Sequence, residues 1–171
     1  AAFLTRNINV ESEGFEIDGK FQATADLLIN GGLTYADSIN ADDGSDLAQA
    51  PKVTAVLGFL HETELDSIDF TLNTSGFVRY RDKMVSQIND TFPSDSLTTA
   101  NFTIGLRDSD DIWGVNLIAT NLFNQRGSDF SGPPAAPIGA LFGAPTGDGG
   151  ITSETLNEQR MIKIQFRYDF Y

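Results

Sequence analysis

A strict alternation of apolar and polar side chains constrains this chain more than any other feature, and it is clearest in the last segment. There the apolar positions are Ile162, Ile164, Phe166, Tyr168 and Phe170, and the polar positions between them are Lys163, Gln165, Arg167 and Asp169. Successive side chains of a β-strand point to opposite faces, so this segment has one apolar and one polar face. Six more segments alternate in the same way: residues 15–23, 29–35, 52–59, 68–81, 100–107 and 113–120. The exceptions are Phe77 and Ile118 on polar faces and Gly19, Gly31 and Gly76 on apolar ones. The sequence therefore predicts seven two-faced strands.

Aromatic residues set a length on two of these segments. Ten residues separate Phe70 from Tyr80, and ten separate Trp113 from Phe123. With a rise of about 3.3 Å per residue and a tilt of roughly 40°, the two rings of each pair lie about 25 Å apart along a barrel axis, the height of the lipid-facing band of an outer-membrane barrel. The spacing indicates strands that cross a membrane.

Composition excludes several other classes of protein. The 171 residues are 40% hydrophobic, yet no apolar stretch approaches the ~20 residues that a membrane helix needs. A formal net charge of -13 argues against a nucleic-acid partner, because phosphate binding needs clustered Lys and Arg. The absence of cysteine excludes disulfides and thiol chemistry. At Ala1 there is neither an initiator Met nor a leader, so we expect any targeting segment to be removed or to lie upstream.

The connections between the predicted strands give an orientation. Short connections at residues 24–26, 62–67 and 108–111 alternate with longer ones at 40–50, 87–95 and 127–155. Outer-membrane barrels have short periplasmic turns and long extracellular loops, so we expect the short connections on the periplasmic side. Aromatic residues then form two expected interface girdles, one near the periplasmic ends (Phe21, Phe59, Phe70, Trp113, Tyr168 and Phe170) and one near the outer ends (Phe15, Tyr35, Tyr80 and Phe123).

Seven strands cannot close a typical bacterial barrel, because the strand number of such barrels is even. Residues 1–9 are interpreted as the tail of an eighth strand. An open edge in lipid would leave backbone groups without hydrogen bonds. The predicted fold is therefore all-β, an antiparallel transmembrane β-barrel segment of about seven to eight strands that belongs to a larger barrel.

Five short motifs carry a resemblance to a known family. They are Gly14-Phe15-Glu16-Ile17, Gly32-Leu33-Thr34-Tyr35-Ala36, Pro51-Lys52, Asn121-Leu122-Phe123-Asn124 and Arg167-Tyr168-Asp169-Phe170. Their order and spacing resemble the C-terminal strands of TonB-dependent outer-membrane receptors, over about residues 9–171. The whole chain, residues 1–171, is thus expected to be the C-terminal part of such a receptor's β-barrel domain, without its plug domain.

The resemblance implies a function and a set of partners. Members of the family are plugged barrels of about 22 strands in the outer membrane of Gram-negative bacteria. They import scarce nutrients such as ferric siderophores, cobalamin or oligosaccharides, with energy from the TonB complex. The implied partners are lipid, the plug domain, the TonB energising complex and the barrel assembly machinery. The family usually ends on an aromatic residue read by that machinery; here Phe170 is in phase with the apolar face and Tyr171 lies one residue beyond it.

Two groups of residues are candidates for contact with a solute. The polar faces would line the lumen with Glu16, Asp18, Lys20, Asp69, Arg79, Arg81, Arg107, Lys163 and Arg167. The long connection at residues 127–155 combines prolines with the apolar residues Phe130, Leu141 and Phe142, which could contact a ligand. A generic hydrated wall and a loop without a ligand role are the plainer interpretations.

Catalytic and metal chemistry find little support, and we expect neither an enzyme nor a cofactor. His61 is the only histidine, and the chain contains no Gly-x-Ser-x-Gly element. The aspartates of residues 42–46 and 108–111 lack the spaced ligand set of a calcium loop.

Two other classes stay open. A soluble carbohydrate-binding β-sandwich would also alternate apolar and polar residues, but gives no reason for two aromatic girdles. A small structural outer-membrane barrel of eight strands accounts for both girdles and connections, and differs from the receptor only in being complete.

Overall fold

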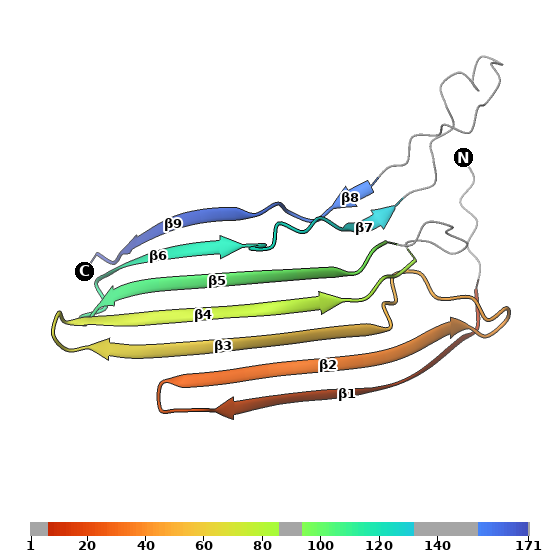
Figure 1. Ribbon diagram of the computed structural model, residues 1–171, viewed down its shortest axis with the longest axis horizontal. Helices are drawn as coiled ribbons and strands as arrows, with labels where there is room; N and C mark the ends of the chain where they lie inside the picture. Colours follow the sequence, from red (N-terminus) through yellow and green to blue (C-terminus); the bar gives the residue numbers. More distant parts are fainter. Residues whose placement is uncertain (1–6, 86–93, 132–153, 171) are drawn as a thin grey trace, which may run out of the picture.

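The computed structural model describes residues 7–85, 94–131 and 154–170, which form strands and connections (Figure 1). The strands are β1 (Val10–Gln22), β2 (Leu27–Asn40), β3 (Val53–Leu65), β4 (Phe70–Arg81), β5 (Leu97–Asp108), β6 (Trp113–Thr120), β7 (Ser128–Ser131), β8 (Glu154–Leu156) and β9 (Met161–Tyr168). Seven of them make one antiparallel sheet in the order β1-β2-β3-β4-β5-β6-β9, and β7 pairs with β8 in a second, two-stranded sheet. The predicted seven-stranded antiparallel fold is confirmed.

Strand pairing aligns the alternation of one strand with that of the next. Leu57 of β3 pairs with Val78 of β4, and Leu117 of β6 pairs with Ile104 of β5 on one side and Ile164 of β9 on the other. Because side chains at paired positions lie on the same side of a sheet, most apolar residues of the seven strands share one face, while a few, such as Val56, Leu97 and Ile118, lie on the other. We call the shared face the apolar face; the opposite, polar face carries Glu16, Asp18, Lys20, Asn30, Thr54, Arg79, Arg107 and Gln165.

The apolar face is exposed even where its strands have neighbours on both sides. Leu57 is 62% exposed, Val78 41% and Leu117 44%, although β3, β4 and β6 are interior strands. Among the described residues only Leu97 and Ala100 are buried hydrophobic side chains. In a water-soluble protein, a sheet of this size would bury one face against a second layer of secondary structure. The described part of the chain supplies no such layer.

One predicted boundary is wrong. The expected turn at residues 62–67 lies at residues 66–69, because β3 continues to Leu65 and β4 begins at Phe70. Glu62 and Glu64 suggested a turn, but they occupy polar-face positions of the strand, while Thr63 and Leu65 face Leu72 and Phe70. Charged residues on the wetted face of a strand are compatible with pairing. Ile68 and Asp69 therefore lie in the turn and not in the strand.

The start of the chain also differs from the prediction. Residues 7–9 are not in a strand, and β1 begins at Val10, five residues before the predicted strand; residues 1–6 of the expected eighth strand lie outside the described residues. Isolated β-bridges close two of the predicted long connections near the strands that they join. Ile39 bridges to Asp46, and Met84 bridges to Ser94, while residues 86–93 lie outside the described residues.

The sheet β7–β8 was not predicted. It lies within the connection between β6 and β9, of which residues 132–153 are outside the described residues.

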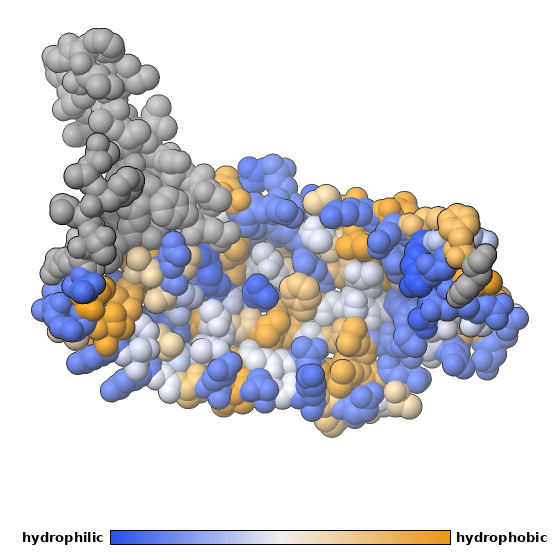
Figure 2. Space-filling view, turned by 180° about the vertical axis from the view of Figure 1, so that it is seen from behind, coloured by the Kyte–Doolittle hydropathy of each residue, from blue (hydrophilic) through white to orange (hydrophobic). Residues whose placement is uncertain are grey.

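The space-filling view shows hydrophilic residues gathered at the two ends of the strands (Figure 2). Within the described ranges no helix is long and apolar enough to span a membrane.

Candidate functional site

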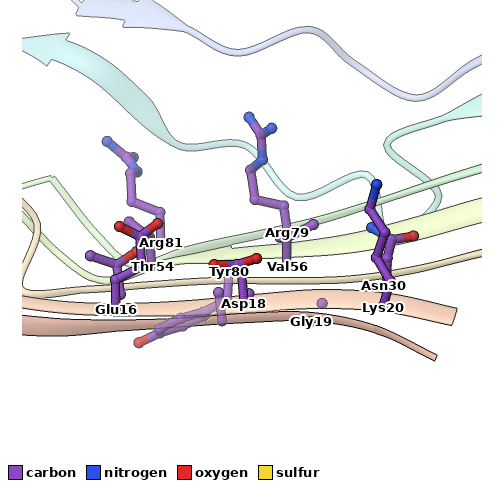
Figure 3. A pocket seen from close by; sticks show the side chains of 14 residues that line it. Glu16, Asp18, Gly19, Lys20, Asn30, Thr54, Val56, Arg79, Tyr80 and Arg81 are labelled. Atoms are coloured by element: carbon purple, nitrogen blue, oxygen red, sulfur yellow. The ribbon is translucent and has the colours of Figure 1, made fainter.

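A hollow of about 590 Å³ lies on the polar face of β1 to β4. Strand register builds it, because Glu16, Thr34, Thr54 and Arg81 occupy one row across the four strands, and Asp18, Gly32, Val56 and Arg79 occupy the next. The middle of each row is made of small side chains, which leaves room above the sheet. Figure 3 shows Arg79 and Arg81 pointing to one side of β4 while Tyr80 points to the other.

The carboxylates and the guanidinium groups of the hollow are separated, whereas Lys20 lies on the same strand as the carboxylates. The carboxylates of Glu16 and Asp18 come from β1 and the guanidinium groups from β4, and strands three apart in a sheet are about 14 Å apart. Within the described ranges, the side chains of Glu16, Asp18 and Arg79 form neither an ion pair nor a hydrogen bond. These exposed groups are available to a solute or to another part of a larger protein.

The other predicted polar-face residues are distributed along the sheet. Arg107 lies 3.6 Å from both Glu62 and Asp111, and Arg167 pairs with Asp169, so the arginines near the short turns have acidic partners. Lys163 lies on the polar face of β9, opposite Ile118. Asp69 is in the β3–β4 turn with a positive φ of 55° and does not join this face as expected.

Most of the aromatic residues predicted for the two girdles lie at opposite ends of the sheet. Phe15 stacks on Tyr35 with ring centroids 5.7 Å apart, in the row where β3 begins at Val53, while β1 and β2 continue beyond this row toward the long connections. At the other end Trp113 contacts Phe70 at 5.4 Å and Phe166 at 6.2 Å, and Tyr168 contacts Phe170 at 4.8 Å. Tyr80 and Phe21 lie near the ends of β4 and β1, and Phe123 follows β6.

Phe59 is a correction to that arrangement. The extension of β3 to Leu65 puts Phe59 in the middle of the strand and not near its periplasmic end. Its ring packs against Phe102 with centroids 6.4 Å apart, across Gly76 of the intervening strand. A Cβ at Gly76 would lie 3.0 Å from the Phe59 ring, so the two rings fill the space that a side chain would occupy.

The candidates in the longest connection and at the terminus are only partly described. Phe130 lies in β7, whereas Leu141, Phe142 and Tyr171 lie outside the described residues. Phe170 follows β9 and is 89% exposed.

The sequence analysis missed a network of amides after β6. Asn121 has a positive φ of 47° and is 5% exposed, and its Nδ2 donates to the carbonyl oxygens of Gln125 at 3.0 Å and Glu158 at 2.9 Å. The Oδ1 of Asn101 accepts from the backbone N–H of Asn121 at 2.9 Å. Asparagine tolerates this left-handed conformation better than most residues, which explains its place in the Asn121-Leu122-Phe123-Asn124 motif. Asn directly after an alternating segment was the available signal.

A second network joins β2 to the connection that follows it. The Nζ of Lys52 is 2.9 Å from Asp37 and 3.4 Å from Asp46. The hydrogen bond to Asp37 raises the pKa of Lys52 above its usual 10.5. The pair therefore stabilises the fold below that pH, and its contribution is lost as the pH rises through the raised pKa. Because Lys52 and Asp37 are each 42% exposed, solvent keeps this contribution small.

In the described ranges, His, Cys, Asp and Glu form no group of three or more that could hold a metal ion. His61 lies on the apolar face of β3, with its Nδ1 3.3 Å from the hydroxyl of Thr74 on β4.

Comparison with known proteins agrees with this geometry. The crystal structure of the ferric yersiniabactin uptake receptor FyuA from Yersinia pestis superposes with a TM-score of 0.78 and 14% identity, over 95% of this chain and 24% of that one. Pseudomonas aeruginosa FpvA, solved with bound ferric pyoverdine, gives a TM-score of 0.67 and 15% identity, over 95% of this chain and 20% of that one. The chain thus spans a quarter or less of these solved receptors.

No curated protein matches the sequence. The profile of the family described as "TonB dependent receptor-like, beta-barrel" matches residues 1–124. That match covers most of the chain and includes β1 to β6 with their aligned apolar face. The chain therefore belongs to the TonB-dependent receptor β-barrel family.

Proposed function

We propose that this chain forms part of the barrel wall of an outer-membrane receptor that imports a scarce nutrient. The observation that carries the proposal is the exposed apolar face of interior strands, exemplified by Leu57 and Leu117. Lipid covers such a face in a barrel, while the opposite face lines a water-filled interior. A soluble sandwich would need a second sheet against Leu57 and Leu117, and β7–β8 pairs only with itself.

The orientation follows from the connections. The turns at residues 23–26, 66–69 and 109–112 lie on the periplasmic side, and the connections that follow β2, β4 and β6 lie outside the cell. The two clusters of aromatic rings then lie at the two membrane interfaces. The aromatic end of the last strand, at Phe170 and Tyr171, serves as the signal for the barrel assembly machinery.

The polar hollow faces the interior of the receptor. There Glu16, Asp18 and Arg79 contact the plug domain or the passing solute, and the TonB complex supplies the energy through the plug. Phe130, Leu141 and Phe142 of the longest connection contact the incoming ligand outside. The remainder of the receptor supplies the plug and the other strands.

Ferric siderophores are the proposed class of ligand, because the two solved receptors that resemble this chain are described with ferric yersiniabactin and with ferric pyoverdine. The test is uptake of iron-radiolabelled yersiniabactin and pyoverdine by cells that produce the full-length receptor, compared with cells that lack it. A control uses the same cells without TonB.

We expect receptor-dependent and TonB-dependent accumulation of iron with at least one of the two siderophores. Uptake that depends on the receptor and on TonB for cobalamin or an oligosaccharide, but for neither siderophore, would replace the ligand class and keep the transporter. Absence of the receptor from the outer-membrane fraction would refute the function itself.

A further inference from the structure

The connection between β6 and β9 is closed at its base by a set of hydrogen bonds. The N–H of Gly127 donates to Asn157 Oδ1 at 2.7 Å, and the N–H of Asn157 donates back to the Gly127 carbonyl at 3.2 Å. Asn157 Nδ2 also donates to the carbonyl of Gln125 at 3.1 Å. The outgoing and returning arms of the connection are thus joined before β7 begins.

The same base is attached to the main sheet. The side chain of Gln125 accepts from the N–H of Thr98 on β5 at 2.8 Å, and Asn121 ties the outgoing arm to Glu158 of the returning arm. The backbone N–H of Arg160 donates a hydrogen bond to Asn124 Oδ1 at 3.1 Å. Bonds to two arms and to β5 leave this segment little freedom to move as a loop.

Two further contacts fix the direction in which the connection leaves the sheet. Gly127 is buried against Leu97, so that a Cβ built on Gly127 would lie 3.1 Å from Leu97 Cδ1 and 3.5 Å from Leu97 Cβ. Arg81 Nη2 donates to the carbonyl of Ser128 at 3.3 Å. Leu97 and Arg81 are paired neighbours on the polar face, so the connection bends toward that face and away from the apolar one.

We propose that Asn121, Gln125, Gly127, Ser128 and Asn157 form a fixed brace that holds the start of the β6–β9 connection over the polar face. The brace is a permanent part of the rim of the passage, and Arg81 joins it to the hollow that contains Arg79. This inference rests on the proposed function only in treating the polar face as the wall of the passage.

A disulfide tests the brace in the full-length receptor, freed of any cysteine outside this chain. The 3.5 Å separation at Leu97 and Gly127 falls within the 3.5–4.5 Å range that disulfides show between Cβ atoms. Receptor with Leu97→Cys and Gly127→Cys should therefore form the disulfide on mild oxidation, to the same extent with or without ferric yersiniabactin. The matched control is Thr99→Cys with Gly127→Cys, which moves one thiol about 6.6 Å along β5. This pair should not form a disulfide.

A second measurement covers failure of the double variant to fold. Gly127 is buried and its neighbour Arg126 is exposed. In the folded receptor, the cysteine of the Gly127→Cys variant should therefore react with a water-soluble maleimide at least about tenfold more slowly than that of the Arg126→Cys variant. Equal labelling rates, or no more disulfide than in the control pair, would overturn the brace. Neither result depends on transport. The proposal of a brace can therefore be refuted while the proposed function stands, and the proposed function can be refuted while the brace stands.

Discussion

At Gly14, β1 approaches β2 so closely that no side chain fits. A Cβ there would overlap the carbonyl oxygen of Tyr35 and lie 2.9 Å from Ala36 Cα, both of which are backbone atoms. The backbone of a paired strand cannot give way without breaking the ladder. This contact explains the glycine of the Gly14-Phe15-Glu16-Ile17 motif, whose phenylalanine stacks on Tyr35.

Gly14→Ala should destabilise the receptor by about 1 to 3 kcal/mol, as overpacking does. Gly19→Ala is the matched control, because a Cβ at Gly19 on the same strand meets no atom within 4 Å; its effect should stay within about 0.5 kcal/mol. Urea unfolding of the purified receptor in lipid vesicles measures both. Equal losses at the two positions would show that close approach of β2 is not the reason for Gly14.

Among the elements, the end of β6 is tied to both arms of the following connection by one side chain, that of Asn121. Asn121 is buried, holds a positive φ and donates to two carbonyl oxygens that belong to the two arms of the connection. Asn121→Gly keeps the backbone conformation and removes both hydrogen bonds. The expected loss is about 1 to 3 kcal/mol, because two part-buried hydrogen bonds are removed, each worth about 0.5–1.5 kcal/mol.

Asn124→Gly is the control for that variant. Asn124 also has a positive φ, of 50°, but it is exposed and its side chain accepts a single hydrogen bond, from Arg160. Its substitution should lower the urea midpoint of the receptor less than Asn121→Gly does. The opposite order would contradict the role given to Asn121.

The sequence predicted the strands better than it predicted their ends. Period-two alternation identified all seven strands of the main sheet, because lipid and water on opposite faces demand opposite side chains. It failed at Glu62 and Glu64, since a charged residue in a turn and one on a polar face look alike in sequence. The brace could not be predicted, because it joins Gln125 to Asn157 across 32 positions.

At the scale of the whole molecule, the sheet is open. In the described chain β1 and β9 each pair with one neighbour, which leaves a row of N–H and C=O groups at either edge. Lipid cannot satisfy these groups. The chain covers 24% and 20% of two solved receptors, and in the function proposed above further strands of a larger barrel would pair with both edges.

The central claim is that the sheet separates lipid from the interior of a receptor, and β3 tests it most directly. Spin labels are placed one at a time at residues 54–60 of the receptor in vesicles, and their collisions with oxygen and with a water-soluble nickel complex are measured. Labels at Ala55, Leu57 and Phe59 should show high access to oxygen and low access to nickel, and labels at Thr54, Val56 and Leu60 should not. Oxygen access that does not alternate from one residue to the next would contradict the account. So would high oxygen access at Thr54, Val56 and Leu60 with low access at Ala55, Leu57 and Phe59.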